Sequence, residues 1–131
     1  MKLRSHCPIN FALEHFGDKW SLLIIRDLMF KNKRYYNEFF SADEKISTSV
    51  LGDRLKSLEK SGIITKSVDH VKKSRIKYSL TEMGKSLIPT MIEMILWSAK
   101  FDRDTGTPDE FIQKTITDRE KLISEIYKSL E

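Results

Sequence analysis

Apolar residues recur at helical spacing through the first third of the chain. Between Asp18 and Phe30 they cover more than one side, which predicts a largely buried helix. These residues are Trp20, Leu23, Ile24, Ile25, Leu28 and Met29. A shorter helix is predicted over about Ile9–Phe16. Pro8 suits its first helical position, and Gly17 tolerates the left-handed conformation that follows many helix ends.

The segment from Ser47 to Lys60 has the clearest amphipathic pattern. Ser47 is a favourable N-cap residue, and Gly62 follows the predicted end of the helix. At about 100° per residue, three leucines share one side and polar, mostly basic residues share the other. The leucines are Leu51, Leu55 and Leu58, and the opposite side carries Ser49, Asp53, Lys56 and Lys60. The leucines therefore anchor a helix whose polar face points outward. A short helix over about Tyr35–Ala42 is expected before it.

Two short segments after this helix alternate between apolar and polar residues, as half-buried strands do. They cover about residues 63–69 and 75–80 and enclose the cationic tip HVKKS. The order is two helices, a short helix, a turn, a polar-faced helix and a hairpin, which is typical of a winged helix-turn-helix. The expected fold class is mainly α with a small antiparallel β-hairpin, with dimerisation helices at both ends.

Apolar residues are in excess after the hairpin. Thr81 is expected to cap a helix that reaches about Asp102 and is kinked or broken at Pro89. Its apolar positions cover well over half of the circumference, whereas a surface helix of a monomer needs a stripe of only about 100°. We expect a second copy of the chain to bury the surplus, with packing by the C-terminal segment as the alternative. The residues expected at this dimer contact are Leu87, Met91, Met94, Ile95 and Trp97.

The last segment has its own amphipathic pattern. Thr107-Pro108-Asp109-Glu110 matches a capping box with proline at the first helical position. Thr117-Asp118-Arg119-Glu120 is a second match, so one helix and two helices both remain open. The expected division is a winged helix-turn-helix domain that includes its dimerisation helix, residues 7–103, and a C-terminal amphipathic helical extension, residues 104–131.

Basic residues gather in the middle of the chain. The formal net charge is +4, but residues 54–77 alone hold eight Lys and Arg against two Asp and Glu. A local excess of this kind indicates a polyanionic partner such as nucleic acid. A solvated, lysine-rich surface is the alternative.

The composition also bears on other classes of protein. At 131 residues the chain has the size of one compact domain, and no apolar run approaches the roughly 20 residues of a membrane span. The single cysteine, Cys7, forms no internal disulfide, so a reducing, cytoplasmic location is expected. The histidines and Cys7 lack the usual spacings of metal ligands. Without a Gly-rich phosphate loop, a nucleophile elbow or paired catalytic carboxylates, we expect no enzyme, no metal and no cofactor.

An ordered set of short motifs extends from Cys7 to Phe101. It consists of Cys7-Pro8, Gly17 with Lys19-Trp20, Lys33-Arg34-Tyr35 through Asn37-Glu38, Ile46-Ser47, Leu51, Arg54-Leu55, Leu58, Gly62, Tyr78-Ser79-Leu80-Thr81, Gly84, Pro89 and Trp97. This set resembles the HxlR family of bacterial winged-helix transcriptional regulators, relatives of the MarR group. Wings of that family often carry prolines before the arginine and an acidic residue two positions after it. Here the tip is HVKKS and Lys77 stands in the acidic place, which makes the wing more cationic.

The resemblance implies a homodimeric regulator that binds double-stranded DNA, and the residue pattern agrees. Helix 47–60 would read the major groove of an inverted-repeat operator, while the wing, residues 66–77, adds phosphate contacts. The expected DNA-binding residues are Lys33, Arg34, Thr48, Ser49, Gly52, Asp53, Arg54, Lys56, Lys72, Lys73, Arg75 and Lys77. For Asp53 an intramolecular partner such as Lys56 or Lys60 is equally expected. The alternative function is a winged helix used for protein–protein interaction, without specific DNA binding.

Cys7 is the candidate redox sensor. It lies beside His6 and just ahead of a helix start, a position that favours the reactive thiolate of a cysteine. Its oxidation would give a mixed disulfide with a small thiol or a bridge to Cys7 of a second subunit. The resemblance agrees, because several members of the family sense oxidants or electrophiles through a cysteine at this place. The alternative is a packing cysteine at the dimer contact without a signalling role.

Overall fold

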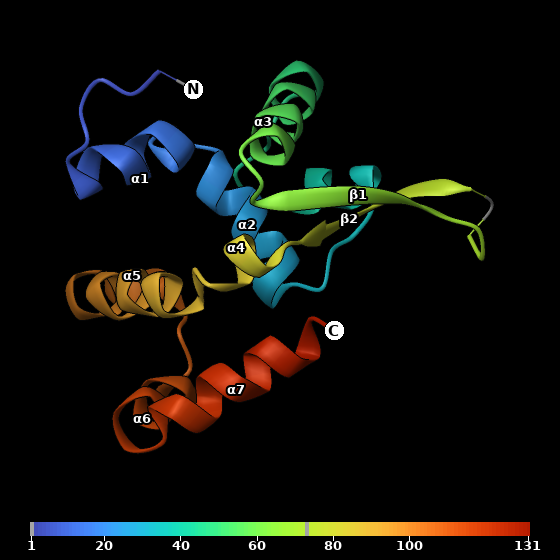
Figure 1. Cartoon of the computed structure of the whole chain (residues 1–131). Coiled ribbons are helices and arrows are strands. Elements are labelled where there is room, and N and C mark those ends of the chain that lie inside the picture. Colours follow the sequence, from blue (N-terminus) through green and yellow to red (C-terminus); the bar gives the residue numbers. More distant parts are fainter. Residues whose placement is uncertain (1, 73) are drawn as a thin grey trace. The chain divides into compact units, whose positions relative to one another are not determined.

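The computed structural model describes residues 2–72 and 74–131 and divides into two compact units, Met1–Gly84 and Lys85–Glu131. The first contains α1 (Pro8–Phe16), α2 (Ser21–Phe30), the 3-10 helix η1 (Tyr36–Ser41), α3 (Thr48–Lys60), β1 (Ile64–Asp69) and β2 (Arg75–Leu80), followed by the short α4 (Glu82–Lys85). The second contains α5 (Ile88–Phe101), η2 (Arg103–Thr105), α6 (Asp109–Thr117) and α7 (Arg119–Ser129). Figure 1 shows these elements. This division groups α5 with the C-terminal helices, whereas the division expected from the sequence lies at residue 103.

The core of the first unit forms where α2, α3, η1 and the hairpin meet. The predicted burial of α2 is confirmed, and the leucine side of α3 faces the same core. The buried apolar residues of this unit are Ile24, Ile25, Leu28, Met29, Phe39, Leu51, Leu55, Leu58, Ile63, Ile64 and Leu80. The predicted fold class, mainly helical with one antiparallel hairpin, is therefore confirmed.

The hairpin has a register that separates its two faces. Ile64 pairs with Leu80 and Lys66 with Tyr78, while Asp69 pairs with Arg75 next to the tip. Directly opposite residues point to the same face of an antiparallel pair, and faces alternate along each strand. Ile64, Lys66, Tyr78 and Leu80 therefore lie on the face toward the core, and Asp69 and Arg75 lie on the other. Outside the named strands, a bridge from Tyr35 to Lys77 extends the sheet beyond β2.

Two glycines end helices by different means. Gly62 follows α3 with φ +83°, the left-handed conformation that its sequence position predicts. Gly17 follows α1 with φ −79°, so the predicted left-handed end of α1 is wrong. A β-carbon at Gly17 would lie 2.5 Å from the carbonyl oxygen of Leu13. Glycine is needed there because the chain passes close to the preceding turn.

The predicted helix from Thr81 to Asp102 is broken into α4 and α5. Thr81 starts it as expected, because its hydroxyl accepts a hydrogen bond from the backbone N–H of Gly84 at 3.2 Å. Pro89 then lies in the first turn of α5. A proline causes no loss there, since the first N–H groups of a helix have no intrahelical acceptor. The break expected from Pro89 thus occurs just before it.

The C-terminal segment of the second unit folds into two helices, α6 and α7. Neither begins with the predicted capping box, because no side chain caps either N-terminus. The Thr107 hydroxyl instead lies 2.9 Å from that of Thr105. Arg119 of α7 forms an ion pair with Glu93 of α5, and Leu122 of α7 is buried. The second unit is therefore held by both polar and apolar contacts.

Candidate nucleic-acid interface

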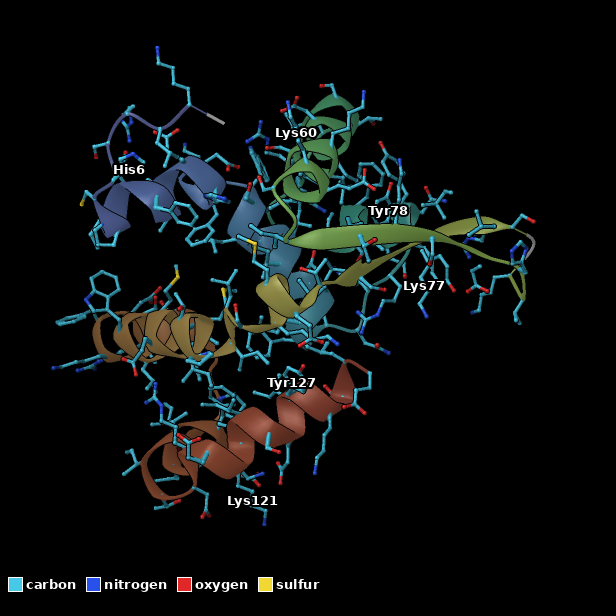
Figure 2. The ribbon with its side chains drawn as sticks, in the orientation of Figure 1. His6, Lys60, Lys77, Tyr78, Lys121 and Tyr127 are labelled. Atoms are coloured by element: carbon cyan, nitrogen blue, oxygen red, sulfur yellow. The ribbon has the colours of Figure 1, made fainter. Side chains whose placement is uncertain are left out.

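α3 presents an exposed polar face. Leu51, Leu55 and Leu58 are at most 3% exposed and anchor the helix in the core of the first unit. Ser47 caps it as predicted: its hydroxyl accepts a hydrogen bond from the backbone N–H of Val50 at 3.3 Å. The exposed residues on the opposite side are Ser49, Asp53, Lys56 and Lys60, the last labelled in Figure 2, and Thr48 is exposed in the first turn. The structure thus brings three of the predicted DNA-binding residues, Ser49, Asp53 and Lys56, together on one exposed helix face.

Gly52 lies in the middle of this helix without a packing reason for being glycine. A β-carbon built on it would meet nothing within 4 Å. Glycine in a helix interior is less favourable than alanine by about 1 kcal/mol. The helix therefore carries a small loss of stability at a position where a side chain would find open space.

Arg54 makes its polar contacts within the protein. Its guanidinium donates to the carboxylate of Asp53 at 3.1 Å from Nε and lies 3.4 Å from a carboxylate oxygen of Asp18. The side chain is 27% exposed. The intramolecular partner of Asp53 is therefore its neighbour Arg54, and not Lys56 or Lys60 as expected from the sequence. This pairing reduces the repulsion that Asp53 would otherwise exert on a phosphate backbone.

Lys33 and Arg34 are directed toward the protein as well. The ammonium of Lys33 lies 3.4 Å from the buried carboxylate of Asp27, and its side chain is 16% exposed. One guanidinium nitrogen of Arg34 donates to the carbonyl oxygens of Leu28 at 2.8 Å and Lys33 at 2.7 Å. Burial lowers the pKa of Arg34 from its ordinary value. Both side chains hold the turn between α2 and η1 in place.

The wing presents its cations next to one another. Lys72, Arg75 and Lys77 follow one another from the tip along β2, whereas the predicted contact Lys73 lies outside the described residues. Figure 2 shows Lys77 and Tyr78 leaving β2 on opposite faces. The guanidinium of Arg75 lies 4.2 Å from the ring centroid of Tyr35, and the ammonium of Lys72 lies 5.6 Å from it. The sequence pattern did not reveal this aromatic support.

Tyr35 also makes a polar contact with the opposite strand. Its hydroxyl donates to one carboxylate oxygen of Asp69, while the other oxygen accepts from the backbone N–H groups of Val71 at 3.0 Å and Lys72 at 3.3 Å. The hydrogen bond from Tyr35 lowers the pKa of the Asp69 carboxyl and raises the pKa of the tyrosine. The first residues of the wing tip are thus tied to η1 through a single carboxylate.

Asp18 is a second contact that the sequence analysis missed. Its carboxylate accepts hydrogen bonds from the backbone N–H groups of Trp20 and Ser21, at 2.9 Å each, and from the Ser21 hydroxyl at 2.6 Å. Burial alone would raise the pKa of Asp18, but these hydrogen bonds and the charge of Arg54 lower it on balance. The available signal was an aspartate shortly ahead of an apolar run, because Asp is among the residues preferred at helix starts.

The other predicted site residues lie apart from this interface in the chain. Cys7 is exposed and occupies the N-cap position of α1. On α5, Met94 and Trp97 are exposed, Ile95 is half-buried and Met91 is only 6% exposed. Leu87, the N-cap residue of α5, is half-buried. Phe101, which the prediction did not include, is exposed and its ring centroid lies 5.5 Å from that of Trp97.

The structure of residues 2–72 and 74–131 also bears on other classes of site. No group of three or more His, Cys, Asp or Glu side chains in this part of the chain is placed to hold a metal ion. Within the same residues, no helix is long and apolar enough to cross a membrane.

A helix with an exposed polar face, anchored by α2 and followed by a basic hairpin, defines a winged helix-turn-helix DNA-binding protein. Residues 15–105 match the family of HxlR-like helix-turn-helix proteins. The chain belongs to this family and is a transcriptional regulator of the helix-turn-helix type, not an enzyme.

Individual relatives agree with this assignment. The chain is 34% identical over 91 residues to YybR, an HTH-type transcriptional regulator of Bacillus subtilis strain 168, covering 70% of this chain and 72% of YybR. The structure is similar to the oxidised form of the redox regulator HypR, with a TM-score of 0.64 and 33% identity, covering 72% and 96% of the two chains. It is also similar to the reduced form of the transcriptional regulator YodB from B. subtilis, with a TM-score of 0.62 and 31% identity, covering 75% and 96%.

Proposed function

We propose that this regulator acts as a homodimer that binds an inverted-repeat operator with α3 in the major groove and the wing on the flanking backbone. One observation carries the proposal: α3 is anchored by buried leucines on one side and exposes a continuous polar face on the other. An α-helix fits the major groove of B-DNA, where each base pair presents a distinct pattern of donors and acceptors.

The proposed DNA contacts fall into two groups. Thr48, Ser49, Gly52 and Lys56 form the reading face of α3. The wing residues Lys72, Lys73, Arg75 and Lys77 contribute phosphate contacts that position the protein without specifying sequence. Lys33, Arg34 and Arg54 act chiefly inside the protein, because each is engaged by a carboxylate or a backbone carbonyl. Asp53 is proposed to orient Arg54 and to accept from a cytosine amino group only where such a base faces it.

A dimer is supported by the apolar surface of α5. Trp97 is 69% exposed and its ring lies next to that of Phe101, which is 68% exposed, with Met94 on the same helix. Aromatic residues of this size are seldom left in water at adjacent positions, and they are enriched in the cores of protein interfaces. Met91 contributes less, since it is already buried within the chain. We therefore propose that Met94, Trp97 and Phe101 form the centre of the α5 contribution to the dimer.

Selection of binding sites from a random duplex pool tests the operator proposal. Reduced protein is used at near-physiological salt, because weak electrostatic binding otherwise dominates. We expect an inverted repeat with half-sites about one helical turn apart. Recovery of no motif, with only salt-labile binding, would contradict the proposal and favour a winged helix that binds proteins.

We further propose that Cys7 is a redox sensor. The exposed position of its thiol at the start of α1 supports this, as does the similarity to HypR, a redox regulator. Oxidation would join two Cys7 thiols of a dimer, or one Cys7 to a small thiol, while an oxidant takes up two electrons and two protons.

Diamide is a suitable oxidant for testing Cys7. We expect treated protein to run as a dithiothreitol-reversible dimer or mixed disulfide, with a changed affinity for the selected operator. The Cys7→Ser variant serves as the matched control and should show neither effect. Operator binding that is the same before and after complete oxidation of Cys7 would exclude the sensor.

A further inference from the structure

The side chain of Tyr35 connects the start of η1 with the far strand of the wing. The backbone of Tyr35 lies beside β2, where it bridges to Lys77, and the neighbouring Arg34 carbonyl accepts a hydrogen bond from the N–H of Tyr78 at 2.7 Å. Its hydroxyl nevertheless reaches Asp69, the last residue of β1. The Tyr35 side chain therefore extends across β2 and connects the segment before η1 with the end of β1.

Asp69 links Tyr35 to the backbone at the tip of the wing. One carboxylate oxygen accepts the tyrosine hydroxyl, and the other accepts the backbone N–H groups of Val71 and Lys72. Asp69 also pairs with Arg75 across the hairpin. These contacts fix the direction in which the tip leaves the strands, because they tie two backbone amides of the turn and the Tyr35 hydroxyl to one carboxylate.

The ring itself supports the cations. Arg75 and Lys72 both lie over the face of Tyr35, and Glu38, which accepts from the backbone N–H groups of Arg34 and Tyr35 at 2.9 Å, lies at the base of the cluster. Cations placed over an aromatic face are held by the electron-rich ring. Two long, rotamer-rich side chains are thereby restricted before any partner arrives.

We propose that the bond between Tyr35 and Asp69 is a latch that preorganises the wing for DNA, with Tyr35 acting as a positioning residue rather than a contact. This inference rests on the proposed function and adds a residue that determines affinity through the wing. Ordering a mobile hairpin and its side chains on binding lowers affinity by the entropy lost. A wing that is already ordered avoids that loss while making the same phosphate contacts.

The test compares Tyr35→Phe with Tyr78→Phe. The first variant removes only the hydroxyl and keeps the ring beneath Arg75 and Lys72. The second removes a hydroxyl from the same wing, and that hydroxyl makes no hydrogen bond to any residue that the structure describes. Affinity for the duplex recovered by site selection is measured as a function of salt concentration, together with amide hydrogen exchange at Val71 and Lys72.

We expect Tyr35→Phe to bind about threefold to tenfold more weakly at every salt concentration, with an unchanged salt slope. A slope that stays constant means that the phosphate contacts are kept and only their preorganisation is lost. The Val71 and Lys72 amides should exchange faster in Tyr35→Phe and at the wild-type rate in Tyr78→Phe. Asp69→Ala removes the acceptor of the Tyr35 hydroxyl together with the acceptor of the Val71 and Lys72 amides, so adding Tyr35→Phe to Asp69→Ala should weaken binding no further.

Three outcomes overturn the latch. Wild-type affinity of Tyr35→Phe would show that the bond does not contribute to binding. Unchanged amide exchange would show that it does not order the tip. A reduced salt slope would show that Tyr35 acts through a phosphate contact. Failure of the operator proposal is distinguishable, because wild-type protein would then select no motif although the exchange experiment could still detect the latch.

Discussion

Asp18 is one residue with two structural tasks. It accepts the backbone N–H groups of Trp20 and Ser21 where α2 begins, and it lies beside the guanidinium of Arg54 on α3. Loss of an N-cap side chain typically lowers stability by about 1 kcal/mol. We therefore expect Asp18→Ala to lower the free energy of unfolding by about that amount, measured by urea denaturation. Asp18→Asn keeps a capping oxygen and should lose less; an equal loss in both would contradict capping as the cause.

The same carboxylate predicts a pH dependence. The pKa of Asp18 is lowered in the folded protein, so the charged form contributes stability above the ordinary pKa of about 3.9. That contribution is lost as the pH falls through the lowered, folded-state pKa. The difference in melting temperature between wild type and Asp18→Asn should therefore be largest near pH 6 and shrink toward pH 3. A difference that stays constant over this range would show that the charge of Asp18 plays no part.

Gly52 predicts opposite effects on stability and binding. Because a β-carbon there meets nothing within 4 Å, Gly52→Ala should stabilise the protein by up to about 1 kcal/mol. The added methyl group stands on the proposed reading face, where it would keep the helix backbone away from the base edges. We expect weaker operator binding together with a higher melting temperature. Unchanged or tighter operator binding by Gly52→Ala would show that DNA does not approach α3 at Gly52.

Contacts between distant residues could not be predicted from the sequence. Tyr35 and Asp69 are 34 positions apart, and only the folded hairpin brings them together. Lys33 and Arg34 were expected to contact DNA, yet the buried carboxylate of Asp27 forms an ion pair with Lys33. A count of charges gives their number but not the direction in which each side chain turns.

Elements were predicted more fully than contacts, because their signals are local. Ser47, Gly62 and Pro89 each act on their own turn, and all three influence helix ends as expected. The alternating pattern of residues 75–80 likewise gave β2 with its exact bounds. The predicted capping boxes of α6 and α7 failed because the same residue pattern is compatible with other hydrogen bonds, such as that between Thr105 and Thr107.

The wing as an element predicts a specific salt dependence. Lys72→Ala should weaken binding to all duplexes alike and lower the slope of log affinity against log salt by about 0.9, the value for one lost phosphate contact on B-DNA. Lys121→Ala, an exposed lysine on α7, makes the same change in net charge and should leave the slope unchanged. Equal effects of the two variants would indicate that the net charge of the protein, and not the wing, determines how affinity depends on salt.

At the scale of the whole molecule, the exposed aromatic residues of α5 predict the state of assembly. Trp97→Ala should shift the protein from dimer toward monomer in sedimentation equilibrium, because the side chain buries a large apolar area in the proposed contact. Binding to the inverted repeat should weaken far more than binding to a single half-site. Ile116→Ala on α6 removes another residue that is 71% exposed and should leave the dimer intact. A monomeric wild type would contradict the proposed contact.

On α3, the residues that anchor the helix differ from those proposed to contact DNA, and this has a consequence for the evolution of such a protein. The leucines that hold the helix and the residues that face outward from it share no position. Substitutions at exposed positions usually alter stability by no more than about 0.5 kcal/mol. After a gene duplication, one copy could therefore acquire a new target site by single replacements at Thr48, Ser49 or Lys56, with every intermediate still folded. A scaffold of this kind is well suited to giving rise to many regulators with different targets.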